Sequence, residues 1–283
     1  MTIHQKSITR AHATITRAKS NGAATFCSGI GQFDTHKNDG QDYTGITGKD
    51  IAALVQAPPN VDKDKARWFI PSDYLAHDAR EHDAQRTHGR FYWLPLDVDD
   101  NDLSRQDVSD AVAAVTGGAR FLMYSSRSAK PDNRKWRALV PLKTPIEGLD
   151  YYDTVAAFND LLADASAGVL IADRALQRPG QLIYLPNKGD FYESEIAKGA
   201  LLDLAVSHPI IKRRDETRRQ RAEADAKARE WKNWKARQPA SDNSNIVDAF
   251  NAANTVADLL ARYGYARAGQ SQDYRSPMQQ SGS

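Results

Sequence analysis

The chain has 283 residues, of which 41% are hydrophobic, and its mean hydropathy is −0.62. This length exceeds one typical domain and allows a sizeable buried core, whereas no apolar run reaches membrane-spanning length, so we expect a cytoplasmic protein. The net charge of +2 means that any affinity for nucleic acid must come from local basic patches, and the single cysteine, Cys27, excludes an internal disulfide framework and a cysteine-based zinc site.

The first ninety residues predict short elements joined by polar segments. Residues 1–22 are polar and basic and predict a basic arm, although their composition also fits a transit peptide. We expect a short strand within 25–33, a short capped helix over 49–56 and a buried strand over 67–70. Residues 77–90 predict a polar helix or loop whose cationic side chains face anions; these side chains are His77, Arg80, His82, His88 and Arg90.

An aromatic and apolar run over 90–98 predicts a buried strand that ends in an acidic cluster. Side chains alternate across a strand, so Asp97 and Asp99 point to the same face. Two such carboxylates repel each other unless a cation lies between them, and oxygen ligands of this kind suit Mg²⁺ or Mn²⁺. The alternative is a solvated turn or a helix cap, and Ser104 with Asp107 does form the pattern of a capping box.

The following segment predicts a helix over 104–115 and a hairpin with strands at 120–125 and 136–142. Its loop is rich in serine and basic residues, and hydroxyls with cations near two carboxylates are what a triphosphate with bound Mg²⁺ requires. A solvated basic hairpin tip is the alternative. The candidate nucleotide-binding residues of this hairpin are Ser125, Ser126, Arg127, Ser128, Lys130, Lys135 and Arg137.

The last part of the chain predicts helices and one more strand. Residues 151–165 form an amphipathic pattern, and residues 181–186 predict a strand. Residues 212–237 lack the apolar spacing of a core helix, so we expect a charged, exposed linker helix rather than a dedicated nucleic-acid clamp. An amphipathic pattern resumes over 243–263, and the last twenty residues are polar and irregular.

Three segments occur in an order that resembles the archaeo-eukaryotic primase (AEP) superfamily, in particular the primase-polymerase domains of phage and plasmid replication proteins. They are Leu96-Asp97-Val98-Asp99, then Tyr124 to Ser128 with Lys135-Trp136-Arg137, then Asp173 with Arg178, Gln181 and Tyr184-Leu185-Pro186. The resemblance covers about residues 45–205 and implies an α/β (α+β) fold, in which an RRM-like antiparallel sheet packs with an N-terminal αβ unit.

The same resemblance divides the chain into four parts. A basic arm with the first elements spans 1–44, the primase-polymerase domain 45–205, a charged helical linker 206–240 and the start of a small helical module 241–283. The last part is similar to the region that joins such primases to a helicase, so we expect a fragment of a longer primase-helicase, acting in a bacterial host or phage-infected cell.

Carried over position by position, the resemblance implies that Asp97, Asp99 and Asp173 hold two Mg²⁺ or Mn²⁺ ions and carry catalysis. The family usually has Ser-x-His in its middle motif, whereas this chain has Ser-Ser-Arg-Ser and no histidine there. We therefore give the triphosphate contacts to the hairpin residues, with Lys130 as a substitute. The implied partners are a single-stranded DNA template, an NTP or dNTP and a replisome helicase; the candidate DNA contacts are Arg178, His88 and Arg90.

Three functions compete at this point. The first is a metal-dependent primase-polymerase, favoured by the three carboxylates and the basic hairpin. The second is a non-catalytic replication-initiation module that uses the same fold to bind DNA, favoured by the missing histidine. The third is a metal-dependent nuclease, since the same ions can activate water; the basic hairpin argues for a triphosphate and against it.

Overall fold

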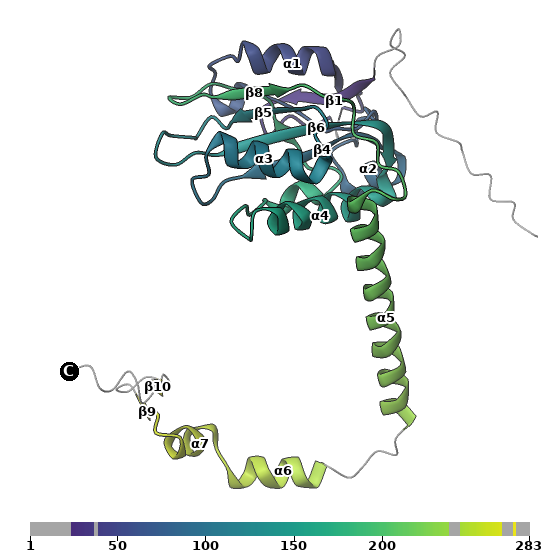
Figure 1. Cartoon of the computed structure of the whole chain (residues 1–283). Helices are drawn as coiled ribbons and strands as arrows, with labels where there is room; N and C mark the ends of the chain where they lie inside the picture. The colour runs from purple at the N-terminus through teal and green to yellow at the C-terminus, as the bar shows by residue number, and fades with distance from the viewer. Residues whose placement is uncertain (1–23, 37–38, 238–243, 268–273, 276–283) are drawn as a thin grey trace, which may run out of the picture. The chain divides into compact units, whose positions relative to one another are not determined.

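The computed structural model describes residues 24–36, 39–237, 244–267 and 274–275 (Figure 1). The predicted arm over 1–22 and most of the polar tail lie outside these residues. The chain divides into two units, Met1–Gln220 and Arg221–Ser283, which are described separately below. The first unit is a mixed α/β structure, as predicted, and it contains two antiparallel sheets.

The smaller sheet joins segments that are far apart in the sequence. Its strand order is β2-β1-β3-β7, and its pairs are antiparallel. The last strand comes from more than a hundred residues downstream of the others, through the pair Trp68↔Tyr184. The predicted strands within 25–33 and 181–186 are present but shorter. The four strands are β1 (Thr25–Ile30), β2 (Thr44–Thr47), β3 (Arg67–Phe69) and β7 (Ile183–Tyr184).

The second sheet carries the acidic strand and the predicted hairpin. Its order is β4-β6-β5-β8, again antiparallel, so β6 lies between the acidic strand and its own hairpin partner. Arg137 of β6 therefore lies opposite Asp97 on one side and Tyr124 on the other. The four strands are β4 (Arg90–Val98), β5 (Phe121–Ser125), β6 (Trp136–Glu147) and β8 (Ser194–Ala197).

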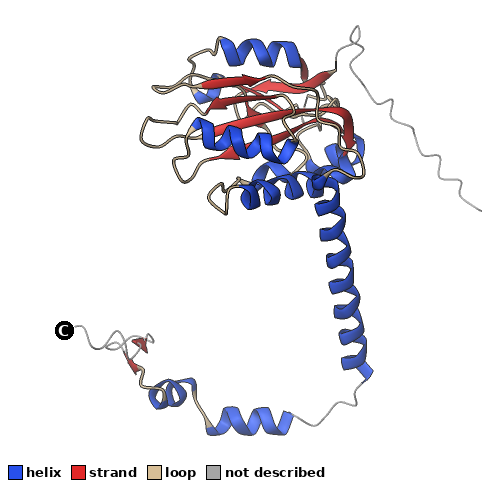
Figure 2. Ribbon diagram, in the orientation of Figure 1, coloured by secondary structure: helices blue, strands red, loops and turns tan. Residues whose placement is uncertain are grey.

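Three predicted helices of the first unit, α1, α3 and α4, begin and end within three residues of their expected bounds, and the segment predicted as a polar helix or loop over 77–90 contains the short helix α2 (Figure 2). Ser104 and Asp107 form a capping box at the start of α3, and Gly117 ends this helix in the left-handed conformation with φ +64°. The capping reading of these two residues is thus confirmed. The helices and 3₁₀ turns are α1 (Gly48–Gln56), η1 (Lys63–Lys65), α2 (His82–His88), α3 (Arg105–Thr116), α4 (Gly148–Ala165) and η2 (Arg174–Gln177).

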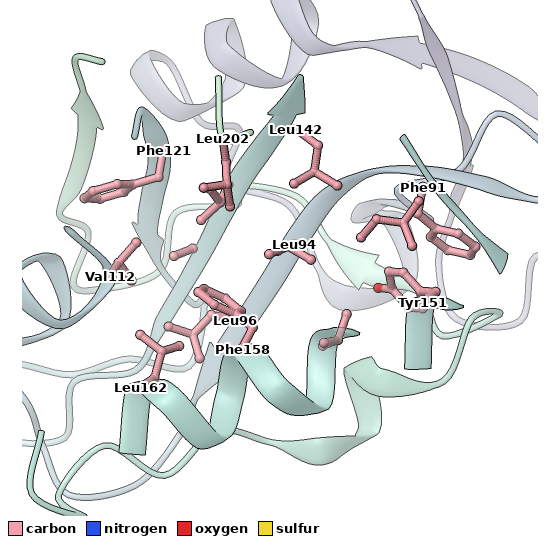
Figure 3. Packing of buried hydrophobic residues seen from close by; sticks show 14 of the residues in the cluster. Phe91, Leu94, Leu96, Val112, Phe121, Leu142, Tyr151, Phe158, Leu162 and Leu202 are labelled. Carbon is pink, nitrogen blue, oxygen red and sulfur yellow. The ribbon is translucent and has the colours of Figure 1, made fainter. Parts of the chain in front are cut away.

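Alternation along the strands gives the second sheet two buried faces. On one face, Leu94 and Leu96 of β4 belong to the same core as Val112 of α3 and Phe158 and Leu162 of α4 (Figure 3). On the other face, Trp93, Leu122 and Leu139 pack with α1 and with the smaller sheet, through Ile51, Phe26 and Phe69. Asp97 lies an even number of residues from Trp93 on β4, and Arg137 lies two residues from Leu139 on β6. Both charged side chains therefore lie on this second, otherwise apolar face.

The predicted charged helix is α5 (Pro209–Arg237). Its first turns belong to the first unit: Ile210 is fully buried, and Arg213 and Arg218 bond to Asp164 and Asp153 of α4. No helix among the described residues is long and apolar enough to cross a membrane. The second unit continues with α6 (Ser244–Ala253), α7 (Val256–Arg262) and the short pair β9 (Ala266–Arg267) and β10 (Tyr274–Arg275).

Candidate active site

A cavity of about 550 Å³ lies in the first unit and is lined by residues of both sheets. Its walls come from the end of β4, the β5–β6 hairpin, the two 3₁₀ turns and β7 with the segment after it. All three sequence segments that carry the family resemblance contribute to it. Its polar and charged lining residues are Lys63, Asp97, Asp99, Tyr124, Ser125, Ser126, Arg127, Ser128, Arg137, Asp173, Gln181, Tyr184 and Asn187.

The three candidate carboxylates all line this cavity. Asp97 is the penultimate residue of β4, and Asp99 follows the end of that strand. Asp173 precedes η2, where its Oδ1 accepts a hydrogen bond from the N–H of Ala175 at 2.8 Å. The backbone N–H of Asp173 also donates to the carbonyl of Asp97 at 2.8 Å. This backbone bond places the third carboxylate beside the first.

Asp97 is held by a buried arginine. The Nε of Arg137 donates to Oδ2 of Asp97 at 2.9 Å, and the Asp97 residue is only 7% exposed. Oδ1 of Asp97 is buried and has no hydrogen-bond partner among the described residues. Burial raises the pKa of Asp97 and the nearby carboxylates of Asp99 and Asp173 raise it further, whereas the Arg137 cation lowers it. Arg137 therefore supplies the charge that favours the ionised form.

The donor set fits a hard cation in its chemistry, because it consists of carboxylate oxygens and includes the unpaired, buried Oδ1 of Asp97. Its present arrangement is not a coordination sphere: within the described part of the chain, no group of three or more Asp, Glu, His or Cys residues could hold a metal ion. Basic side chains face two of the carboxylates instead. Arg137 bonds to Asp97, and Nζ of Lys135 lies 3.5 Å from Oδ1 of Asp99.

The hairpin residues divide into cavity-lining and structural groups. The hydroxyls of Ser126 and Ser128 lie 3.3 Å apart in the lining. Ser125 is fully buried, and its Oγ accepts the N–H of Glu193 at 3.1 Å, which ties β5 to the approach of β8. Arg127 lines the cavity, but its Nη1 donates to the side chain of Asn60 at 2.6 Å.

Lys130 and Lys135 do not line the cavity, although Lys135 reaches Asp99. Lys130 forms a backbone bridge with Asn133 at the turn of the hairpin. Of the seven predicted nucleotide-binding residues, the structure therefore brings five to the cavity wall.

The candidate DNA contacts lie in two places. Arg178 ends η2, and its Nη2 donates to the side chain of Gln181 at 3.3 Å, so it lies next to a cavity-lining residue. His88 packs against the ring of Tyr74, with centroids 5.2 Å apart, and Arg90 bonds through Nε to the Asp73 carboxylate at 3.0 Å. Neither His88 nor Arg90 lines the cavity, and both tie the end of α2 and the start of β4 to the 72–78 loop.

Sequence reasoning missed a further part of the wall. Lys63 lies over the ring of Tyr184, with Nζ 5.6 Å from the centroid, and both residues line the cavity. The Tyr184 hydroxyl is also buried without a hydrogen-bond partner among the described residues. Asn187 exchanges hydrogen bonds with the backbone of Val61 at 2.9 and 3.0 Å. The pairing of β3 with β7 brings these wall residues together. A pairing between strands so far apart in the sequence cannot be predicted from a local sequence pattern.

No protein-family model and no curated protein matches the chain. Among solved structures, the chain is similar to the AEP domain of the primase-polymerase (PrimPol) of cyanophage S-2L, with 15% sequence identity, 64% of this chain and 85% of that chain covered, and a TM-score of 0.37. A TM-score this low does not establish a shared fold, so the function has to be inferred from the residues of the cavity.

Proposed function

We propose that the first unit is a nucleotidyltransferase, a primase-polymerase that joins NTPs or dNTPs on a single-stranded DNA template. One observation carries this proposal: three motif segments that are far apart in the sequence meet in one cavity of about 550 Å³. There, Asp97, Asp99 and Asp173 share a wall with the hydroxyls of Ser126 and Ser128. The ordered motifs resemble those of the archaeo-eukaryotic primase superfamily, and this resemblance implies the same activity.

Phosphoryl transfer asks a protein mainly for positioning and charge compensation. Asp97, Asp99 and Asp173 would hold Mg²⁺ or Mn²⁺, which when bound neutralises the triphosphate and lowers the pKa of the attacking hydroxyl. The chain itself supplies Arg137, whose cation lowers the pKa of Asp97 and so opposes the effect of burial. It also presents two serine hydroxyls as donors to phosphate oxygens.

Two features of the wall account for binding of the rest of the nucleotide. Lys63 adds a positive charge on the side of the cavity formed by the smaller sheet. The ring and hydroxyl of Tyr184, with the amide of Gln181, offer apolar contact and hydrogen bonding to a base or sugar. Two residues of the cavity wall carry a buried polar atom without a hydrogen-bond partner among the described residues, Asp97 Oδ1 and Tyr184 Oη, and a ligand that fills the cavity would supply these partners.

The second candidate is a non-catalytic DNA-binding module for replication initiation. The observation that favours it is the engagement of Asp97 by Arg137 and the position of Lys135 beside Asp99, which replaces an assembled metal site by basic side chains. In this case the same cavity would bind a nucleotide or a DNA end without transferring it.

Nucleotide incorporation on a single-stranded DNA template separates the two. The assay uses Mg²⁺ or Mn²⁺, NTPs or dNTPs, and templates with and without a primer. We expect growing products from the wild type and a loss of at least about a hundredfold in Asp97→Asn/Asp99→Asn. Asp100→Asn is the matched control, because Asp100 belongs to the same acidic run but is exposed and does not line the cavity. It should retain the activity.

Absence of product from every protein, together with equal binding of the template by all three, would instead establish the binding module. Equal amounts of product from the wild type and from Asp97→Asn/Asp99→Asn would show that these carboxylates take no part in the reaction. Circular dichroism of each variant verifies that the substitutions leave the fold intact.

A further inference from the structure

Two exposed tryptophans stack on each other in the second unit. Trp231 and Trp234 belong to α5, are three residues apart and therefore share one face of the helix. Their ring centroids lie 4.9 Å apart with an interplanar angle of 25°, and the residues are 63% and 52% exposed. Large aromatic side chains gathered on a surface usually mark a binding site.

The charge around these rings is strongly positive. Residues 227–237, here called the tryptophan segment, contain Lys227, Arg229, Lys232, Lys235 and Arg237 against a single acid, Glu230. Lys227, Arg229 and Lys232 are exposed and form no salt bridge among the described residues. The arginines nearer the start of α5 differ, since Arg213 and Arg218 are neutralised by the carboxylates of α4.

We propose that the tryptophan segment binds single-stranded nucleic acid, with bases stacked on Trp231 and Trp234 and phosphates held by the flanking basic side chains. Proteins that bind single strands combine aromatic platforms with positive charge in this way. The tryptophan segment has a single acidic residue, so a basic peptide would be repelled by it. Its exposed positive charges also disfavour a purely apolar partner. Duplex DNA fits poorly, because its bases already stack on one another. This inference does not depend on the proposed catalysis in the first unit.

The chain contains a direct optical probe for this contact. Of its five tryptophans, Trp68, Trp93 and Trp136 are buried at 0%, 6% and 0% exposure, so Trp231 and Trp234 are the ones within reach of an added oligonucleotide. Stacking of a base on an indole quenches its fluorescence. Titration of the full chain with (dT)₂₀ should therefore quench tryptophan emission, and a titration with (U)₂₀ compares DNA with RNA; the matching duplex should quench little.

Affinity is measured in parallel by anisotropy of a labelled (dT)₂₀. We expect Trp231→Ala/Trp234→Ala to weaken binding by at least about tenfold and to abolish the quenching, whereas Trp231→Phe/Trp234→Phe keeps the aromatic faces and most of the affinity. Lys227→Gln/Arg229→Gln/Lys232→Gln should lower the slope of log affinity against log salt by about 2. Phe250→Ala is the control, since Phe250 is also an exposed aromatic of the second unit (53%) but neighbours the acidic Asp248.

The outcomes separate the possible occupants of the tryptophan segment. Unchanged affinity and quenching in the alanine variant would overturn the proposal, as would equal quenching by duplex and single strand. A change in molecular mass of the alanine variant by sedimentation, with DNA binding unaltered, would mean that the rings contact a second copy of the chain and would also overturn it. Asp97→Asn/Asp99→Asn should still show the quenching, so a failure of the catalytic proposal does not affect this test.

Discussion

The buried pair of Asp97 and Arg137 gives a sharp prediction about stability. Replacing Arg137 by methionine keeps a long apolar side chain but removes the only charged group that bonds to Asp97 within the described part of the chain. Asp97 is 7% exposed, and removal of one partner of a buried pair costs about 3–5 kcal/mol because it leaves an uncompensated charge. We expect Arg137→Met to lower the free energy of unfolding of the first unit by roughly this amount.

The measurement is urea unfolding of the full chain in EDTA, followed by the fluorescence of the buried tryptophans Trp68, Trp93 and Trp136. Lys143→Met is the matched control. Lys143 also belongs to β6 and bonds to Asp203, but the two side chains are 63% and 53% exposed, so this substitution should cost only about 0–1 kcal/mol. A loss in Arg137→Met as small as that in the control would refute the reasoning.

The pH dependence of the loss tests the same cause. Burial raises the pKa of Asp97 and Arg137 opposes this, so the variant should protonate Asp97 at a higher pH than the wild type. Above the unfolded carboxyl pKa of about 3.9, the folded variant then binds more protons than its unfolded chain, and its stability falls as the pH rises. The difference from wild type should thus be smaller at about pH 5 than at about pH 7.5. The double variant Asp97→Asn/Arg137→Met should recover most of the loss, because it removes both charges.

Three further predictions concern the rest of the first unit. Ser104→Ala removes the hydroxyl of the α3 capping box and should lower the unfolding free energy by about 1 kcal/mol, while Ser128→Ala, outside any helix cap, should not. Gly117→Ala meets no atom within 4 Å but places a side chain at φ +64°, so urea unfolding should show a loss of about 1 kcal/mol from backbone strain alone. Burial raises the pKa of the fully buried Cys27 thiol, so a thiol reagent at about pH 8 should leave the native chain unmodified and react once urea unfolds it; rapid labelling of the native chain would contradict this.

Local patterns were sufficient to predict most elements of the first unit. The aromatic and apolar run over 90–98 placed Asp97 at the end of a buried strand, and the Ser104–Asp107 spacing identified the start of α3. The charged character of 212–237 identified α5. Each of these features depends on residues within a few positions of one another, which is the range over which caps, turns and periodicity act.

Long-range pairing positions the cavity residues that local sequence patterns did not identify. Asp173 was assigned by resemblance, but its position comes from a backbone hydrogen bond to Asp97, across more than seventy residues. Lys63 and Tyr184 reach the cavity through the pairing of β3 with β7, whose short strands carry little periodicity of their own. Register between distant strands depends on the whole fold, so neither residue has a local signature.

One long-range contact does have a signal in the sequence. Asp97 interrupts the apolar run Leu94–Val98, and Arg137 interrupts the apolar run Trp136–Leu142, so each strand carries one charge on a face that is otherwise buried. A charge within a buried strand requires a partner of opposite sign, and these two are directly opposed in the β4–β6 register. A slip of one residue in that register would turn one charge toward the α3 and α4 core. The pair that orients the first carboxylate of the cavity therefore also fixes the alignment of the central strands.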